Sequence, residues 1–157
     1  MAQSLHQYLP GIRFIGINND IISGQGATYT LLPSDSGSIV LFDAASQVYT
    51  LPAPSVGMYF DFISTITSST NQEVDTDAAT TFIGGTVQIA TEAATPSGTI
   101  GPKLFSANAA SSVHIKMNGT TKGGIIGSSF RMVCVSSTLW YIEGNLLGSG
   151  TIVTPFT

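Results

Sequence analysis

The stretch LLPSDSGSIVLFDAASQVYTLP, residues 31–52, alternates short apolar runs with small polar turns and contains no positive charge. Its apolar runs, residues 38–42 and 47–51, are rich in the β-branched and aromatic residues that favour strands. Before them, Pro33 to Gly37 has the composition of a type I turn, in which Asp and Ser side chains cap backbone amides and Gly adopts a positive φ. The stretch therefore predicts short strands joined by tight turns.

The same pattern recurs along the chain, whereas no window has the apolar spacing of an amphipathic helix. Residues 103–113 are at most a short helix. We predict an all-β fold of about eight short antiparallel strands in a β-sandwich or jelly-roll-like barrel. The strand candidates are residues 27–32, 38–42, 47–51, 57–67, 81–91, 112–118, 126–136 and 138–147.

The length of 157 residues fits one domain with extended ends. We expect an extended N-terminal arm over residues 1–27, a β-sandwich domain over 28–147 and a C-terminal tail over 148–157. Residues 68–81 and 92–102 have the composition of long loops. No repeat of fixed period is evident.

Charged residues make up only 9% of the chain, against about 25% in ordinary soluble domains. Mean hydropathy is +0.31, yet no window approaches the roughly 18 apolar residues of a membrane span. The N-terminus has no basic segment and places Pro10 and Gly11 where a signal core would lie, so we expect folding in the cytoplasm. Cys134 is the only cysteine and is expected as a buried thiol rather than a disulfide partner.

The net charge is −4, and the five Lys and Arg residues are scattered. This distribution excludes the basic stripe that nucleic acid requires and gives no attraction to an anionic membrane. A neutral protein or glycan surface remains as the expected partner.

No catalytic signature emerges, and we expect a protein that is not an enzyme and needs no cofactor. The only histidines, His6 and His114, are interpreted as outward-facing, and no nucleophile motif accompanies them. Metal ligation has one weak candidate, the alternating carboxylates Glu73, Asp75 and Asp77, although an ordinary acidic loop is favoured.

Two further positions raise structural questions. Asp61 lies between Phe60 and Phe62 and needs a hydrogen-bonding partner; pairing with Glu143 for sugar hydrolysis is a distant alternative. Trp140 and Tyr141 are consecutive, so their rings point to opposite faces of a strand. One ring is expected to pack against a neighbour or to bind sugar.

Four short motifs stand out along the chain: Asp35-Ser36-Gly37, Thr50-Leu51-Pro52, Gly57 followed by Phe60-x-Phe62, and Trp140-x-x-x-Gly144. This series resembles a β-rich module of tailed-bacteriophage virions, found in head decoration (cement) proteins and in tail fibres. The resemblance covers residues 28–67 and 138–157, and the ending GTIVTPFT is also similar to small virion proteins. It implies a homotrimer of β-sandwich or jelly-roll subunits seated where capsomers meet.

From the resemblance we expect a structural decoration protein on the capsid surface, bound to its own copies and to the major capsid protein. The alternative is a tail-fibre or receptor-binding module that recognises host glycan through exposed aromatics such as Tyr59, Trp140 or Tyr141. The expected interface residues are Ile12, Phe14, Ile15, Ile17, Ile21, Ile22, Trp140, Pro155 and Phe156.

Overall fold

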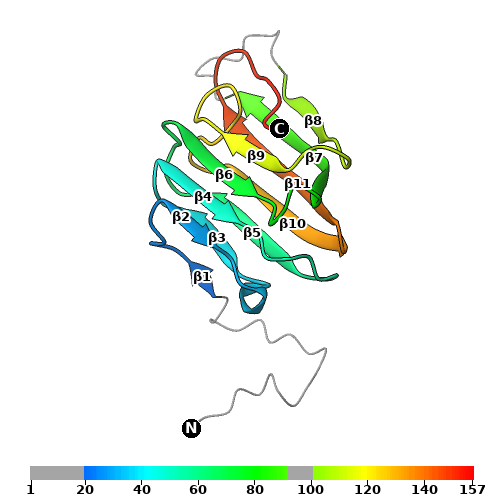
Figure 1. Cartoon of the computed structure of the whole chain (residues 1–157). Helices are drawn as coiled ribbons and strands as arrows, with labels where there is room; N and C mark the ends of the chain where they lie inside the picture. The colour runs from blue at the N-terminus through cyan, green and yellow to red at the C-terminus, as the bar shows by residue number, and fades with distance from the viewer. Residues whose placement is uncertain (1–19, 92–100) are drawn as a thin grey trace.

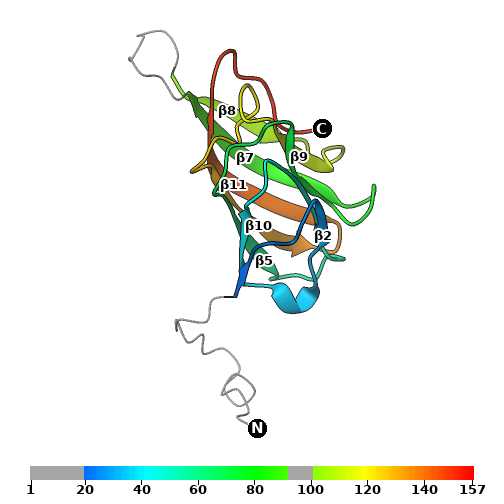
Figure 2. The same ribbon diagram turned by 90° about the vertical axis from the view of Figure 1, so that its left-hand side faces the viewer.

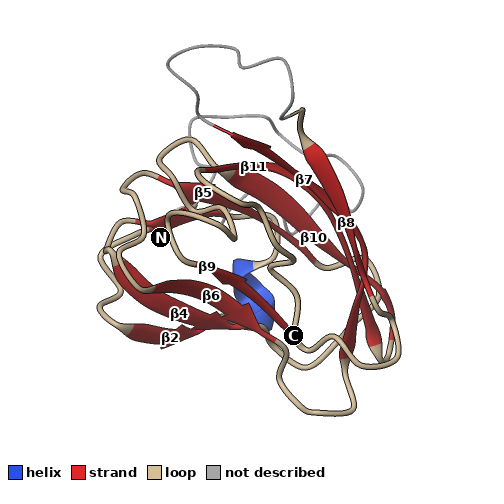
Figure 3. Ribbon diagram, turned by 90° about the horizontal axis from the view of Figure 1, so that it is seen from above, coloured by secondary structure: helices blue, strands red, loops and turns tan. Residues whose placement is uncertain are grey.

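The computed structural model describes residues 20–91 and 101–157 (Figure 1). Two β-sheets face each other in these residues, with the core between them (Figure 3). The described chain contains no α-helix, and its one helical element is the 3-10 turn Pro33–Asp35. The prediction of an all-β fold is confirmed.

The seven-stranded sheet, called the large sheet below, and the four-stranded sheet, called the small sheet, are built from strands far apart in the sequence. The order in the large sheet is β1 (Ile21–Ile22), β3 (Ile39–Phe42), β5 (Tyr59–Ser64), β10 (Ser129–Ser136), β11 (Leu139–Gly148), β7 (Phe82–Thr91) and β8 (Lys103–Ala107). The order in the small sheet is β2 (Thr28–Thr30), β4 (Ser46–Thr50), β6 (Asn71–Asp75) and β9 (His114–Met117).

Along the first six strands, the chain alternates between the two sheets, so that successive strands belong to opposite sheets. β1, β3 and β5 lie side by side in the large sheet, and β2, β4 and β6 lie side by side in the small sheet. Each of these neighbouring pairs is parallel, because every strand returns to its own sheet after crossing to the other. This half of the fold is therefore a short β-coil whose turns stack on one another (Figure 1).

The expectation of antiparallel strands is therefore wrong for much of the fold, since both sheets are mixed. Antiparallel pairs join β5 to β10, β10 to β11, β7 to β8, and β6 to β9. β11 and β7 form a further, long parallel pair. The short connection between β3 and β4, residues 43–45, leads the chain to the opposite sheet instead of forming a hairpin.

All eight strand candidates contain a strand, and three strands were not expected. β1 lies in the segment interpreted as an arm, β6 lies in the expected loop 68–81, and β8 replaces the possible helix at 103–113. A polar network stabilises β6: the fully buried Gln72 accepts from Ser64 Oγ at 2.9 Å and donates to the carbonyls of Ala44 and Ile66, each at 3.0 Å. Buried polar groups need such partners.

The core contains the inward side chains of both sheets. Alternation along β5 and β10 directs Phe60, Phe62, Phe130 and Met132 inward, and Cys134 is buried beside them as expected. The rings of Phe62 and Phe130 stack with centroids 5.0 Å apart. Burial raises the pKa of the Cys134 thiol, which keeps this side chain in its neutral form.

The segment after β11 folds back onto the domain. Its end lies along the free edge of β9 (Figures 1 and 2), where the N–H groups of Val113 and His114 donate to the carbonyl of Thr157 at 2.8 and 3.0 Å. Phe156 forms a β-bridge with Ile115 and is part of the core. None of the described residues belongs to a helix long and apolar enough to cross a bilayer.

Candidate functional site

Ionisable side chains gather at two places on the outer surfaces. The acid–histidine cluster (Glu73, Asp75, His114 and Lys116) lies on the small sheet. The sheet hollow lies on the large sheet and has a volume of about 530 Å³. Its lining residues are Ile39, Asp61, Phe62, Ile63, Ser129, Phe130, Arg131, Glu143, Gly144 and Asn145.

Strand register creates the acid–histidine cluster. β6 and β9 are antiparallel, with Glu73 opposite Lys116 and Asp75 opposite His114. Val74 points into the core, so its neighbours Glu73 and Asp75 point outward. Two carboxylates, an imidazole and an ammonium group therefore meet on one face.

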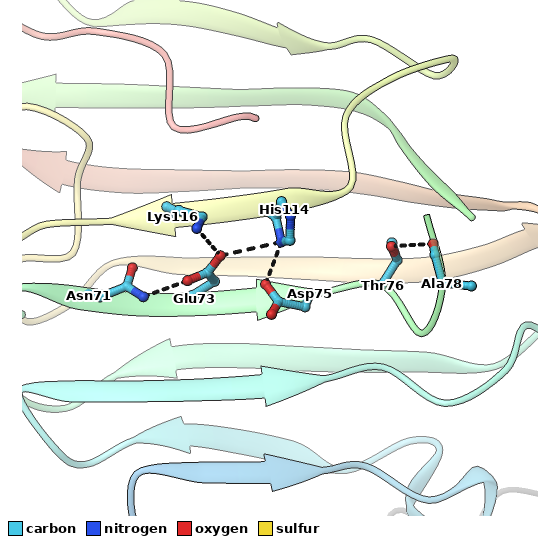
Figure 4. A network of polar contacts seen from close by, with 7 residues as sticks. All are labelled: Asn71, Glu73, Asp75, Thr76, Ala78, His114 and Lys116. Carbon is cyan, nitrogen blue, oxygen red and sulfur yellow. Dashed lines mark hydrogen bonds and ion pairs between the residues drawn. The ribbon is translucent and has the colours of Figure 1, made fainter. Parts of the chain in front are cut away.

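Figure 4 shows the contacts of this cluster. His114 Nδ1 lies 2.7 Å from Asp75 Oδ1 and 3.3 Å from Glu73 Oε1. Lys116 Nζ lies 2.7 Å from the same Glu73 Oε1. Asn71 Nδ2 donates to the other oxygen, Glu73 Oε2. The Glu73 side chain is only 5% exposed, so its charge is compensated within the protein.

The environment moves the pKa values of the two carboxyl groups in opposite directions. Burial raises the pKa of Asp75 above its ordinary value, and this effect outweighs the contact with His114. Burial also acts to raise the pKa of Glu73, but the contacts with Asn71 and Lys116 lower it overall. Glu73 is therefore the carboxyl group that keeps its charge as pH falls.

An ion pair with two hydrogen bonds lies in the sheet hollow. Arg131 on β10 lies opposite Asp61 on β5, and its Nε and Nη2 donate to the two carboxylate oxygens at 2.6 and 2.7 Å. The partner that Asp61 needs is thus a guanidinium group. Tyr59 lies beside the pair, with its ring centroid 5.2 Å from Arg131 Cζ.

The expected interface residues lie in different environments. Ile12, Phe14, Ile15 and Ile17 fall outside the described residues. Ile21 is 59% exposed, whereas Ile22 next to it is buried in the core. Pro155 and Phe156 are also buried against their own chain.

Trp140 lies in the core and has no exposed surface, whereas Tyr141 is 42% exposed on the outer face. The two rings point to opposite faces, as predicted. The full burial of Trp140 leaves none of its ring for a neighbour or a sugar, so the interpretation of Trp140 as a contact residue is corrected. Tyr141 is the ring that faces outward.

Of the weak metal-ligand candidates Glu73, Asp75 and Asp77, the structure brings only the first two into one cluster. Asp77 follows β6 on a turn in which Thr76 Oγ1 donates to the carbonyl of Ala78 at 3.0 Å (Figure 4). Among the described residues, the third group beside Glu73 and Asp75 is His114. Sequence reasoning placed His114 on a polar strand face but gave no signal that β9 pairs with β6.

Comparisons with known proteins give no relative from which a role can be transferred. No family model matches the sequence, and searches of the curated proteins and of the solved structures found no match.

Proposed function

We propose that this chain is a structural subunit of a larger protein assembly, in the specific form of a phage head decoration protein that bridges capsomers. One observation carries the proposal. An aliphatic patch, made of Ile21, Ile39, Leu41 and Ile63, occupies the outer face of β1, β3 and β5. The phage setting, the trimer and the major capsid protein as partner come from the resemblance of the motifs.

The patch is contiguous because strand register aligns it. Ile21 lies opposite Ile39, and Leu41 lies opposite Ile63. Their sequence neighbours Val40, Phe42 and Phe62 point into the core, so the patch side chains point to the opposite, outer face of the sheet. Contiguous apolar side chains on a solvent-facing sheet are typical of protein contact surfaces.

The ion pair beside the patch fits the same role. Interfaces are enriched in aromatic residues and Arg around an apolar centre, and Arg131 with Tyr59 and Tyr141 supplies these residue types on the same sheet face. A decoration protein acts by adding buried area across subunit borders. Permanent interfaces bury on the order of 2,000 Å² or more, and no covalent chemistry is required.

The test combines solution mass with binding to phage heads assembled without decoration protein. The double variant Ile39→Ser, Ile63→Ser should keep its strand content by circular dichroism but lose self-association and head binding. Val56→Ser is the matched control, because Val56 is an exposed aliphatic side chain outside the patch. A monomeric wild type, or a double variant that still saturates heads, contradicts the proposal.

A second function, recognition of host glycan, is favoured by the sheet hollow. Asp61, Arg131, Glu143 and Asn145 place hydrogen-bonding groups in an open depression, and Tyr141 lies on the same face of β11 as Glu143. Sugar sites combine such polar groups with an aromatic ring. Binding of the wild type to surface polysaccharide, lost in Tyr141→Ala and kept in Val153→Ala, supports this function; equal binding by both variants contradicts it.

A further inference from the structure

The acid–histidine cluster contains three side chains whose ligand atoms converge from two strands. One carboxylate oxygen each of Glu73 and Asp75 and one ring nitrogen of His114 lie within 4.8 Å of one another. We propose that this cluster binds a divalent transition-metal ion of the zinc type, which links β6 to β9 on the outer face of the small sheet. This inference is independent of the proposed function.

Two of the three separations between the ligand atoms are close to those around a tetrahedral ion. Bonds of about 2.0–2.1 Å at tetrahedral angles place the ligand atoms about 3.3 Å apart. His114 Nδ1 lies 3.3 Å from Glu73 Oε1 and 2.7 Å from Asp75 Oδ1. A small outward movement of Asp75, which lies at the end of β6, brings the shorter contact to the same length.

The donor set selects the class of metal. Imidazole nitrogen is a ligand for Zn²⁺, Ni²⁺ and Cu²⁺, whereas Ca²⁺ takes six or more oxygen ligands. The cluster offers one nitrogen and two carboxylates, and Asp77 is not part of it. A zinc-type ion therefore fits better than the calcium ion that the alternating carboxylates suggest.

The buried carboxylate of Glu73 makes this place favourable for a positive charge. Its Oε1 is buried and has no hydrogen bond of normal geometry among the described residues, but it lies 2.7 Å from the ammonium group of Lys116 and 3.3 Å from His114 Nδ1. A buried carboxylate requires a positive partner, and Lys116 fills that role until a metal ion replaces it. Asn71 donates to the other oxygen, which orients the carboxylate in the way that supporting hydrogen bonds orient metal ligands.

Lys116 competes with the metal. Its ammonium group lies 2.7 Å from Glu73 Oε1, so an incoming ion must displace this group. Removal of the Lys116 charge should therefore strengthen binding.

The experiment is isothermal titration calorimetry of the full chain with ZnCl₂ and, separately, CaCl₂ at neutral pH. We expect one Zn²⁺ per chain for the wild type, at least about tenfold tighter binding for Lys116→Met, and loss of binding for His114→Gln. Lys122→Met is the matched control, since Lys122 lies outside the cluster, and it should bind as the wild type does. The wild type should bind Ca²⁺ much more weakly than Zn²⁺.

Thermal unfolding gives a second readout, because an ion that binds only the folded chain raises the melting temperature. Zn²⁺ should raise the melting temperature of the wild type and of Lys116→Met, but not that of His114→Gln. The proposal is overturned if Zn²⁺ binds neither the wild type nor Lys116→Met, or if His114→Gln binds it as tightly as the wild type. Neither result affects the role of the aliphatic patch.

Discussion

Arg131 holds Asp61 through two parallel hydrogen bonds, 2.6 and 2.7 Å long, at directly opposed positions of β10 and β5. β5 is the last large-sheet strand of the β-coil, and β10 is its neighbour in the large sheet. The pair therefore links the β-coil to the rest of the large sheet. It is also the charged centre of the sheet hollow. The contribution of the Asp61–Arg131 pair to the free energy of unfolding can be measured directly.

We expect the Asp61–Arg131 pair to contribute about 0.5–1 kcal/mol to folding, since the Arg131 side chain is 47% exposed and water screens the interaction. A double-mutant cycle with Asp61→Asn and Arg131→Gln, followed by urea unfolding, gives this coupling energy. The coupling should decrease in high salt. Arg131→Lys should lose most of it, because an ammonium group cannot form the two parallel bonds.

Trp140 and Tyr141 should differ sharply in their effect on stability. Trp140→Ala removes a fully buried ring and should cost about 3–5 kcal/mol, whereas Tyr141→Ala should cost less than about 1 kcal/mol. Trp140 Nε1 makes no hydrogen bond with the described residues, so Trp140→Phe should be much milder than Trp140→Ala. Similar unfolding free energies for the two alanine variants would contradict the assigned orientation of the rings.

The strands that the sequence predicted are those whose side chains alternate between core and surface. In β9, Ile115 and Met117 point inward while His114 and Lys116 point outward, and such a pattern is readable without a structure. β6 is different, because Gln72 lies in the core and Val74 is its only aliphatic residue. Its stability depends on hydrogen bonds to distant loops, which composition does not show.

The connections between strands were harder to predict than the strands themselves. Asn118-Gly119 has the composition of a hairpin turn, and Gly119 does adopt a positive φ of 72°. Yet β9 lies in the small sheet and β10 in the large sheet. The acid–histidine cluster was missed for the same reason, since it depends on the pairing of Asp75 with His114, which are far apart in the sequence.

Two glycines with the same backbone conformation separate torsional strain from steric clash. Gly119 and Gly150 both have φ of 72°, but a Cβ on Gly119 would lie 1.9 Å from the carbonyl oxygen of Ser68, and a Cβ on Gly150 would meet nothing within 4 Å. Gly150→Ala should cost about 1 kcal/mol through φ alone. Gly119→Ala should cost at least about 2 kcal/mol more; equal costs in urea unfolding would contradict the close approach to Ser68.

The pKa shifts of the acid–histidine cluster predict opposite pH effects for its two carboxyl groups. The pKa of Asp75 is raised above 3.8 in the folded chain. As pH falls, Asp75 therefore becomes protonated in the folded chain before it does in the unfolded chain, and its contribution to stability increases as pH falls towards 3.8. The pKa of Glu73 is lowered from 4.5, so its contribution is present above pH 4.5 and decreases as pH falls below it.

These signs can be measured as differences from the wild type in urea unfolding between pH 7 and pH 3. The stability of the wild type relative to Asp75→Asn should increase as pH falls towards 3.8. Its stability relative to Glu73→Gln should decrease below pH 4.5. The same sign for both variants would show that the two carboxyl groups do not have the environments described.

Phe156 tests whether the C-terminal segment belongs to its own domain. Its ring is part of the core, and the backbone beside it accepts hydrogen bonds from the amides of Val113, His114 and Lys116. Phe156→Ala should detach the C-terminal segment from the edge of β9, so these three amides should exchange with solvent much faster in hydrogen-exchange measurements. The free energy of this local opening should be below the free energy of global unfolding. Val153→Ala is the control, because Val153 is exposed, and it should leave the exchange unchanged. If the three amides are protected only in the assembled state, the segment contacts a neighbour instead, and Phe156 regains the interface role expected from the sequence.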